Sequence, residues 1–139
     1  MMREYRIVRK NEGKRLSLFH ENVGQTGSWG FPTNEDFKDL FPNYSSTIFN
    51  EIDTSKIDTA LVDGRFRVAC TLKTILECHS NENLTILIHD FWNREKYHIV
   101  LQYLDVVDRA DTLGVFSIKD DLDIGSAKKD YEKYKFIVD

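Results

Sequence analysis

Two short stretches of the sequence carry polar residues that can do chemistry, Asp63-Gly64-Arg65 and His89-Asp90. An imidazole titrates near neutral pH, so His89 can act as a general base that Asp63 or Asp90 orients. The two carboxylates offer a second chemistry, because oxygen ligands suit a divalent metal such as Mg²⁺ or Mn²⁺. The residue types leave both chemistries open. Either one requires the two stretches to meet in space.

The elements around these stretches predict that they do meet. An apolar strand over Ile57 to Val62 ends at Asp63, and a second strand over Leu84 to Ile88 ends at His89. Residues Arg67 to His79 between them have the apolar spacing of a helix, with Val68, Leu72, Ile75 and Leu76 on one stripe. A helical crossover places two such strands side by side and parallel, and ligands bind at the carboxyl ends of strands in open α/β sheets.

The remaining pattern predicts an α/β domain. Met2 to Lys10 has the character of a helix end, and Leu16 to His20 predicts a short strand. Arg94 to Leu104 predicts a helix. Asp105 to Arg109 and Leu113 to Lys119 predict an antiparallel edge pair. We expect a partial Rossmann-like sheet that is mostly parallel, with this C-terminal antiparallel pair and with helices on both faces.

Length and composition limit the class of protein. The 139 residues suffice for one domain, which we assign to residues 1–119, followed by a charged C-terminal tail or helix over residues 120–139. The net charge of -4 gives no reason to expect nucleic acid or a membrane as partner. Cys70 and Cys78 are expected to be reduced thiols. The N-terminal stretch lacks a signal peptide and the chain lacks a membrane span, so we expect a cytoplasmic protein.

Four longer stretches carry a family resemblance: FHENVGQTGSWGFP, IDTALVDGRFRVACTLK, NLTILIHDF and LDVVDRADTLGVFSIK. Together they resemble the C-terminal half of a class I S-adenosylmethionine-dependent methyltransferase, whose seven-stranded fold ends in a reversed hairpin. The run from VDGR to IHDFWNREKY is also similar to the plant glucuronoxylan 4-O-methyltransferase family. The resemblance implies an O-methyltransferase lineage that uses S-adenosylmethionine and acts on a sugar or polysaccharide hydroxyl.

The resemblance also implies roles for individual residues. Asp63 takes the place of the acidic residue that lies near the methyl group and the substrate, and His89-Asp90 stands where the fifth strand ends. The implied catalytic set is Asp63, His89 and Asp90, with Asp63 and Asp90 as the metal ligands if a metal is used. The residues assigned to substrate binding are Arg65, Trp29, Arg94 and Tyr97.

The cofactor-binding half of that family has no counterpart in the sequence. There is no GxGxG-type turn, and Gly24-Gln25-Thr26-Gly27 follows the wrong strand for a cofactor loop. We therefore leave the cofactor-binding residues unassigned and expect the chain alone to be inactive. The missing half would come from an N-terminal partner segment.

Two alternatives remain open. One is that the domain is a non-enzymatic interaction or scaffold module that pairs through an open sheet edge, either as a homodimer or by pairing Leu16 to His20 with Ile57 to Val62. The other concerns single residues: Asp63 and Asp90 only cap the helices that follow them. Arg67 is expected to form a surface or helix-start salt bridge.

Overall fold

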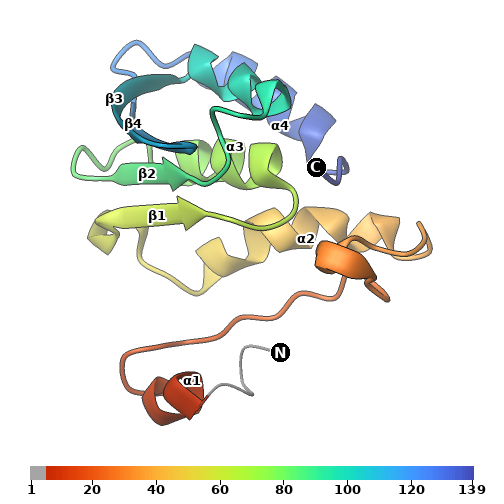
Figure 1. The fold of residues 1–139 in the computed structure, drawn as a ribbon. Helices are drawn as coiled ribbons and strands as arrows, with labels where there is room; N and C mark the ends of the chain where they lie inside the picture. The colour runs from red at the N-terminus through yellow and green to blue at the C-terminus, as the bar shows by residue number, and fades with distance from the viewer. Residues whose placement is uncertain (1–5) are drawn as a thin grey trace.

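The structure, a computed structural model, describes residues 6–139 and contains a four-stranded sheet in the described part of the chain (Figure 1). The strands are β1 (Thr59–Val62), β2 (Thr85–Ile88), β3 (Leu104–Ala110) and β4 (Leu113–Ile118), in the spatial order β1-β2-β4-β3. The first pair is parallel, and the other two junctions are antiparallel. The predicted α/β class is confirmed.

The predicted crossover forms the centre of the domain. Helix α3 (Arg67–Cys78) connects β1 to β2, and Val62 pairs with Ile88 at the carboxyl ends of the two strands. Leu72 and Ile75 of α3 are fully buried, as their helical spacing predicts. This crossover brings Asp63 and His89 to the same edge of the sheet.

The C-terminal hairpin is antiparallel as predicted, but only one of its strands lies at the sheet edge. Strand β4 is inserted between β2 and β3, and Leu87 pairs with Val115. The predicted antiparallel edge pair is confirmed, with β3 as the outermost strand and β4 beside β2.

One face of the sheet is covered and the other is open. Helix α3 contacts β1 and the 3-10 helix η6 (Glu95–Gln102) contacts β3, so both lie on the face where Ile86, Ile88 and Phe116 are buried. Figure 1 shows the sheet in front of α3. Leu61 and Val107 are each 62% exposed. We expected helices on both faces of the sheet. In the described residues, the helices cover one face.

Short helical elements precede β1 and lie beside it. They are η2 (Ser28–Gly30), η3 (Lys38–Leu40), α2 (Phe41–Ser46), η4 (Thr47–Asn50) and η5 (Thr54–Lys56). Helix α2 packs against α3 and buries Phe41. The segment before β1 therefore extends the helical layer and leaves the opposite face of the sheet open.

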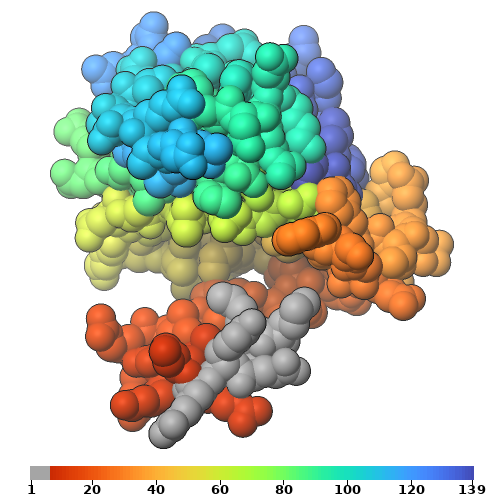
Figure 2. Space-filling model, viewed as in Figure 1, coloured from red at the N-terminus to blue at the C-terminus, as the bar shows by residue number. Residues whose placement is uncertain are grey.

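The predicted strand at Leu16 to His20 does not form. In the described residues Leu16 makes only an isolated bridge to Glu12, and the extended chain that follows has no strand partner. Figure 2 shows this segment and α1 (Arg6–Asn11), in red, below the yellow-green band of β1. Direct pairing with β1 is thus wrong, and dimerisation through β1 stays a prediction. The predicted helix end at Met2 to Lys10 is partly confirmed by α1, and residues 2–5 lie outside the described residues.

Residues 120–139 include helix α4 (Ile124–Tyr134), which packs on α3. Ala127 and Tyr131 are buried, and the Tyr131 hydroxyl lies 3.0 Å from Ser45 Oγ, within hydrogen-bond distance. This charged segment is thus a helix that contributes to the core. Among residues 6–139, no helix has both the length and the apolar character needed to cross a membrane.

Candidate functional site

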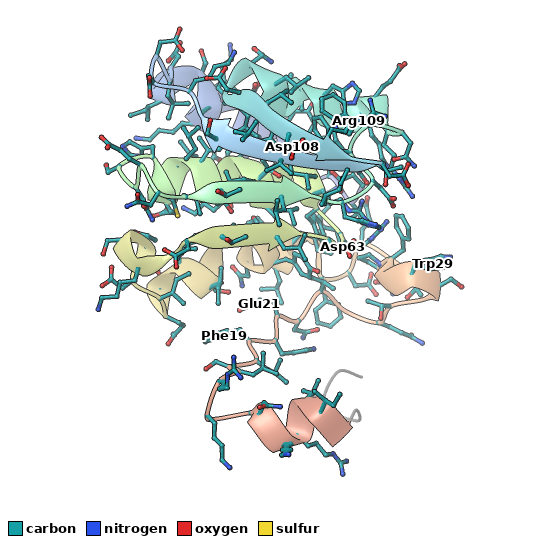
Figure 3. All side chains as sticks on the ribbon, turned by 60° about the vertical axis from the view of Figure 1, so that its left-hand side comes forward. Phe19, Glu21, Trp29, Asp63, Asp108 and Arg109 are labelled. Carbon is teal, nitrogen blue, oxygen red and sulfur yellow. The ribbon has the colours of Figure 1, made fainter. Side chains whose placement is uncertain are left out.

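The carboxyl ends of β1 and β2 bring Asp63, which is labelled in Figure 3, close to His89. The His89 main-chain N–H donates to Val62 O at 3.1 Å, which continues the parallel ladder by one residue. His89 Nδ1 then lies 3.2 Å from Asp63 Oδ1 and 3.7 Å from Asp90 Oδ1. Both His89 and Asp63 are about half exposed, so the ring is open to a ligand. The predicted proximity of these residues is observed.

The turn after β2 is fixed by the C-terminal hairpin. Asp90 has a φ of 55°, in the left-handed region that non-glycine residues rarely adopt. The main-chain N–H groups of Phe91 and Trp92 both donate to Thr112 O, at 2.8 and 3.1 Å. The tip of the β3-β4 hairpin thus holds the His89-Asp90 turn in place.

The buried guanidinium of Arg67 contacts Asp63, Asp90 and the main chain of His89. The sequence pattern did not assign Arg67 this role. The Arg67 side chain is only 5% exposed. Its Nη2 lies 3.2 Å from Asp63 Oδ1, and its Nη1 lies 3.6 Å from Asp90 Oδ2. Arg67 also donates to His89 O at 2.7 Å and to Gly64 O at 3.0 Å. Arg67 starts α3 and pairs with Asp63, so the predicted helix-start salt bridge is confirmed, although the Arg67 side chain is buried in the site and does not lie on the surface.

The alternative that Asp63 and Asp90 cap the following helices is wrong. Phe66 occupies the N-cap position of α3 and makes no side-chain capping bond. The main-chain N–H groups of Arg67 and Val68 instead donate to the Asp139 carboxylate. The two aspartates at the strand ends therefore face Arg67 and His89.

The arrangement does not fit a divalent metal. The Arg67 guanidinium lies between Asp63 and Asp90 and already supplies the positive charge that a metal would bring. In the described part of the chain, no group of three or more His, Cys, Asp or Glu side chains is placed to hold a metal ion.

The four residues predicted to bind substrate occupy different environments. Arg94 is partly exposed and pairs with Asp90 at 3.3 Å. Tyr97 is 1% exposed and lies under the Arg67 guanidinium, with 5.4 Å from Arg67 Cζ to the ring centroid. Tyr97 therefore supports Arg67 and cannot face a substrate, because its helical spacing placed it in the core.

Arg65 and Trp29 are linked through one loop. Arg65 Cζ lies 4.3 Å from the centroid of the Phe31 ring, and no carboxylate of a described residue lies within 4 Å of its guanidinium nitrogens. Its Nε is buried without a hydrogen-bond acceptor. Trp29 is 88% exposed, with a φ of 60°, and Figure 3 shows it at the same end of the sheet as Asp63. The Trp29 loop therefore packs its Phe31 ring against Arg65 and leaves the Trp29 ring exposed at the same end of the sheet.

A pocket of about 390 Å³ runs along the unpaired edge of β1 and ends at Asp63 and Arg65. Its walls are mostly apolar and include Ile48, Ile52, Ile57 and Leu61. Cys70 also lines it, but desolvation raises the pKa of the Cys70 thiol to about 12, and the Asp139 carboxylate adds to this effect. Cys70 is therefore protonated and is no candidate nucleophile.

The residues do not fit a nucleotide-type cofactor. Such cofactors bind where a glycine-rich turn joins a strand to the start of a helix. The Gly24 to Gly30 loop follows an unpaired segment and leads into short 3-10 turns. Between β1 and α3 there is one glycine, and the first N–H groups of α3 are occupied by Asp139.

Comparison with known proteins supports the fold. No family model and no curated protein matches the sequence. Among solved structures, a methyltransferase-like protein from Silicibacter pomeroyi is similar, with a TM-score of 0.74 and 25% sequence identity. The similarity covers 94% of this chain and 68% of that one. The chain therefore has the fold of a methyltransferase-like protein. The similarity to the glucuronoxylan 4-O-methyltransferase family stays a prediction.

Proposed function

We propose that this domain is the acceptor-side half of an S-adenosylmethionine-dependent O-methyltransferase that acts on a sugar or polysaccharide hydroxyl. The observation that carries the proposal is the distance of 3.2 Å between His89 Nδ1 and Asp63 Oδ1 at the joined ends of β1 and β2. The methyltransferase-like structural neighbour supports the class of reaction. The similarity of the VDGR and IHDFWNREKY stretches supports the class of acceptor.

In this proposal His89 is the general base. A sugar hydroxyl is a weak nucleophile, and a positioned base that removes its proton raises the rate by roughly 10²- to 10⁴-fold. The proton is accepted at Nε2, which has no partner among the described side chains, while Asp63 stabilises the positive charge from the Nδ1 side. Arg67 holds Asp63 and Asp90 in position.

The acceptor would approach between the Trp29 loop and the pocket along β1. An exposed indole offers a flat apolar surface on which a sugar ring can stack. Arg65 is a cation without a carboxylate partner in the described residues, so it can hydrogen-bond to the acceptor. Arg94 is partly exposed beside Asp90 and completes this side of the site.

The proposal predicts the tautomer of His89. If Asp63 accepts from Nδ1–H, the neutral ring carries its proton on Nδ1, whereas free histidine prefers the Nε2–H form. Long-range ¹H–¹⁵N spectra of the ring nitrogens should therefore show Nε2 unprotonated. The variant D63N should shift the ring toward the Nε2–H form, more than D90N does, because Asp90 lies 0.5 Å farther away. A predominant Nε2–H tautomer in the unmodified protein would exclude His89 as the proposed base.

The proposal also predicts the behaviour toward the cofactor. Because the described residues offer no glycine-rich turn at a helix start, we expect titration calorimetry with S-adenosylmethionine to show a Kd no tighter than about 1 mM. Circular dichroism of the same sample verifies that the protein is folded. Saturable binding at micromolar concentration would show that the chain holds its own cofactor site, and would overturn the claim that it is one half of the enzyme.

A further inference from the structure

The first turn of α3 is capped by a residue from the other end of the chain. Asp139 is 5% exposed, and its two side-chain carboxylate oxygens accept from Arg67 N at 2.6 Å and from Val68 N at 3.0 Å. The first N–H groups of a helix have no partner within the helix, so a carboxylate there stabilises them. Asp139 supplies the cap that Phe66 does not.

Asp139 binds the main chain of Arg67, and the side chain of Arg67 contacts the groups of the candidate site. The main-chain N–H of Arg67 donates to Asp139, while the Arg67 guanidinium lies between Asp63 and Asp90 and donates to His89 O. The position of the guanidinium therefore depends on the position of the first turn of α3. A shift of that turn would move the guanidinium away from its three partners, Asp63, Asp90 and His89 O.

The turn that leads into α3 is strained, so it needs such a support. Phe66 has a φ of 56° and a ψ of 39°, a left-handed conformation that costs a bulky residue energy. Its ring is held by Phe41 and Tyr44, each with a centroid distance of 5.2 Å. These rings fix Phe66 on one side, and Asp139 fixes the next two residues on the other.

We propose that Asp139 is a positioning residue of the candidate site, which acts on Asp63 and His89 through the first turn of α3 and the Arg67 guanidinium. The role of the site rests on the proposed function, whereas the link from Asp139 to Arg67 does not. Phe136 and Ile137, just before Asp139, are exposed, so a change in this short segment would reach the site through one buried carboxylate.

The test compares two aspartates that cap helices. Asp139 caps α3 although it lies 72 positions after Arg67 in the sequence. Asp123 directly precedes α4 and caps it by accepting a hydrogen bond from Ser126 N at 3.0 Å. D139A and D123A are each expected to raise the equilibrium constant of unfolding about tenfold. Only D139A should shift the Arg67 Nε–H signal and the His89 ring signals in ¹H–¹⁵N spectra. D139N keeps one acceptor oxygen and should leave the Arg67 signal between those of D139A and the unmodified protein.

Each outcome decides the proposal. If D139A or D139N loses stability while the Arg67 and His89 signals stay unchanged, Asp139 is only a structural cap. If D123A shifts the Arg67 signal as much as D139A does, the effect is general destabilisation and the proposal fails. Should D139A not fold, D139N gives the same comparison. A failure of the His89 tautomer test would leave the shift at Arg67 intact, so the two proposals fail separately.

Discussion

Replacing Arg67 with Met is expected to lower the free energy of unfolding by about 3 kcal/mol, because it removes a buried guanidinium that contacts two carboxylates and two main-chain carbonyl oxygens. For a chain of this size that loss lowers the melting temperature by roughly 10 °C. Urea unfolding followed by circular dichroism measures the change. Met fills much of the space of the Arg side chain, so the loss reports the polar contacts more than a cavity.

The physical reason is the number of groups that depend on one guanidinium. Arg67 lies near two carboxylates and donates to two main-chain carbonyl oxygens, and its side chain is only 5% exposed. A planar guanidinium can serve all four, whereas the single ammonium group of Lys cannot. We therefore expect R67K to recover only part of the lost stability.

Arg94 provides a matched control at the same site. It pairs with Asp90 alone and is partly exposed, so R94M should cost less than about 1 kcal/mol. In double-mutant cycles, D63N should couple to R67M by about 1 kcal/mol or more and should not couple to R94M. A cost for R67M no larger than that for R94M would contradict the view that Arg67 connects the site.

The parts of the fold that the sequence predicted correctly depend on local patterns. Ile57 to Val62 and Leu84 to Ile88 are apolar runs, and the helix between them shows its spacing over twelve residues. A right-handed crossover leaves few ways to arrange such a unit, so Asp63 and His89 could be placed together without coordinates. That placement is the part of the candidate site that follows from the sequence.

The parts that could not be predicted depend on partners far along the chain. Asp139 and Arg67 are 72 positions apart, and no periodicity links the end of the chain to the start of α3. Leu16 to His20 has the composition of a strand, but a strand needs a partner, and the structure gives it none in the described residues. The spacing of Tyr97 showed that it faces the core, which argues against its assignment to substrate binding.

A second large effect is expected at Gly114, where we predict that G114A lowers the free energy of unfolding by about 2 kcal/mol. Gly114 lies in β4, opposite Ile88 of β2. A Cβ atom at this position would overlap the ring of Phe116 and would lie 3.3 Å from Phe91 Cδ1. Both rings are fully buried and pack edge to face with a centroid distance of 4.7 Å, so neither has room to move.

Two effects of opposite sign compete in this variant. Gly in a strand is less favourable than Ala by roughly 0.5–1 kcal/mol, so conformational freedom alone predicts that G114A is stabilising. Overpacking a core costs about 1–3 kcal/mol, and the overlap with Phe116 is severe. We expect the overlap to decide the sign. Chemical unfolding of G114A gives the sign directly.

The control lies three residues along the same strand. Ser117 is partly buried in β4, and S117A adds no atom, so its effect should stay within about 0.5 kcal/mol. The smaller side chain in F116L makes room for a Cβ at position 114, so G114A should cost less in that background by about 1 kcal/mol or more. Because Phe91 directly follows Asp90, the same clash should also shift the His89 ring signals. A stabilising G114A, or an equal cost in both backgrounds, would show that Phe116 does not close the space above Gly114.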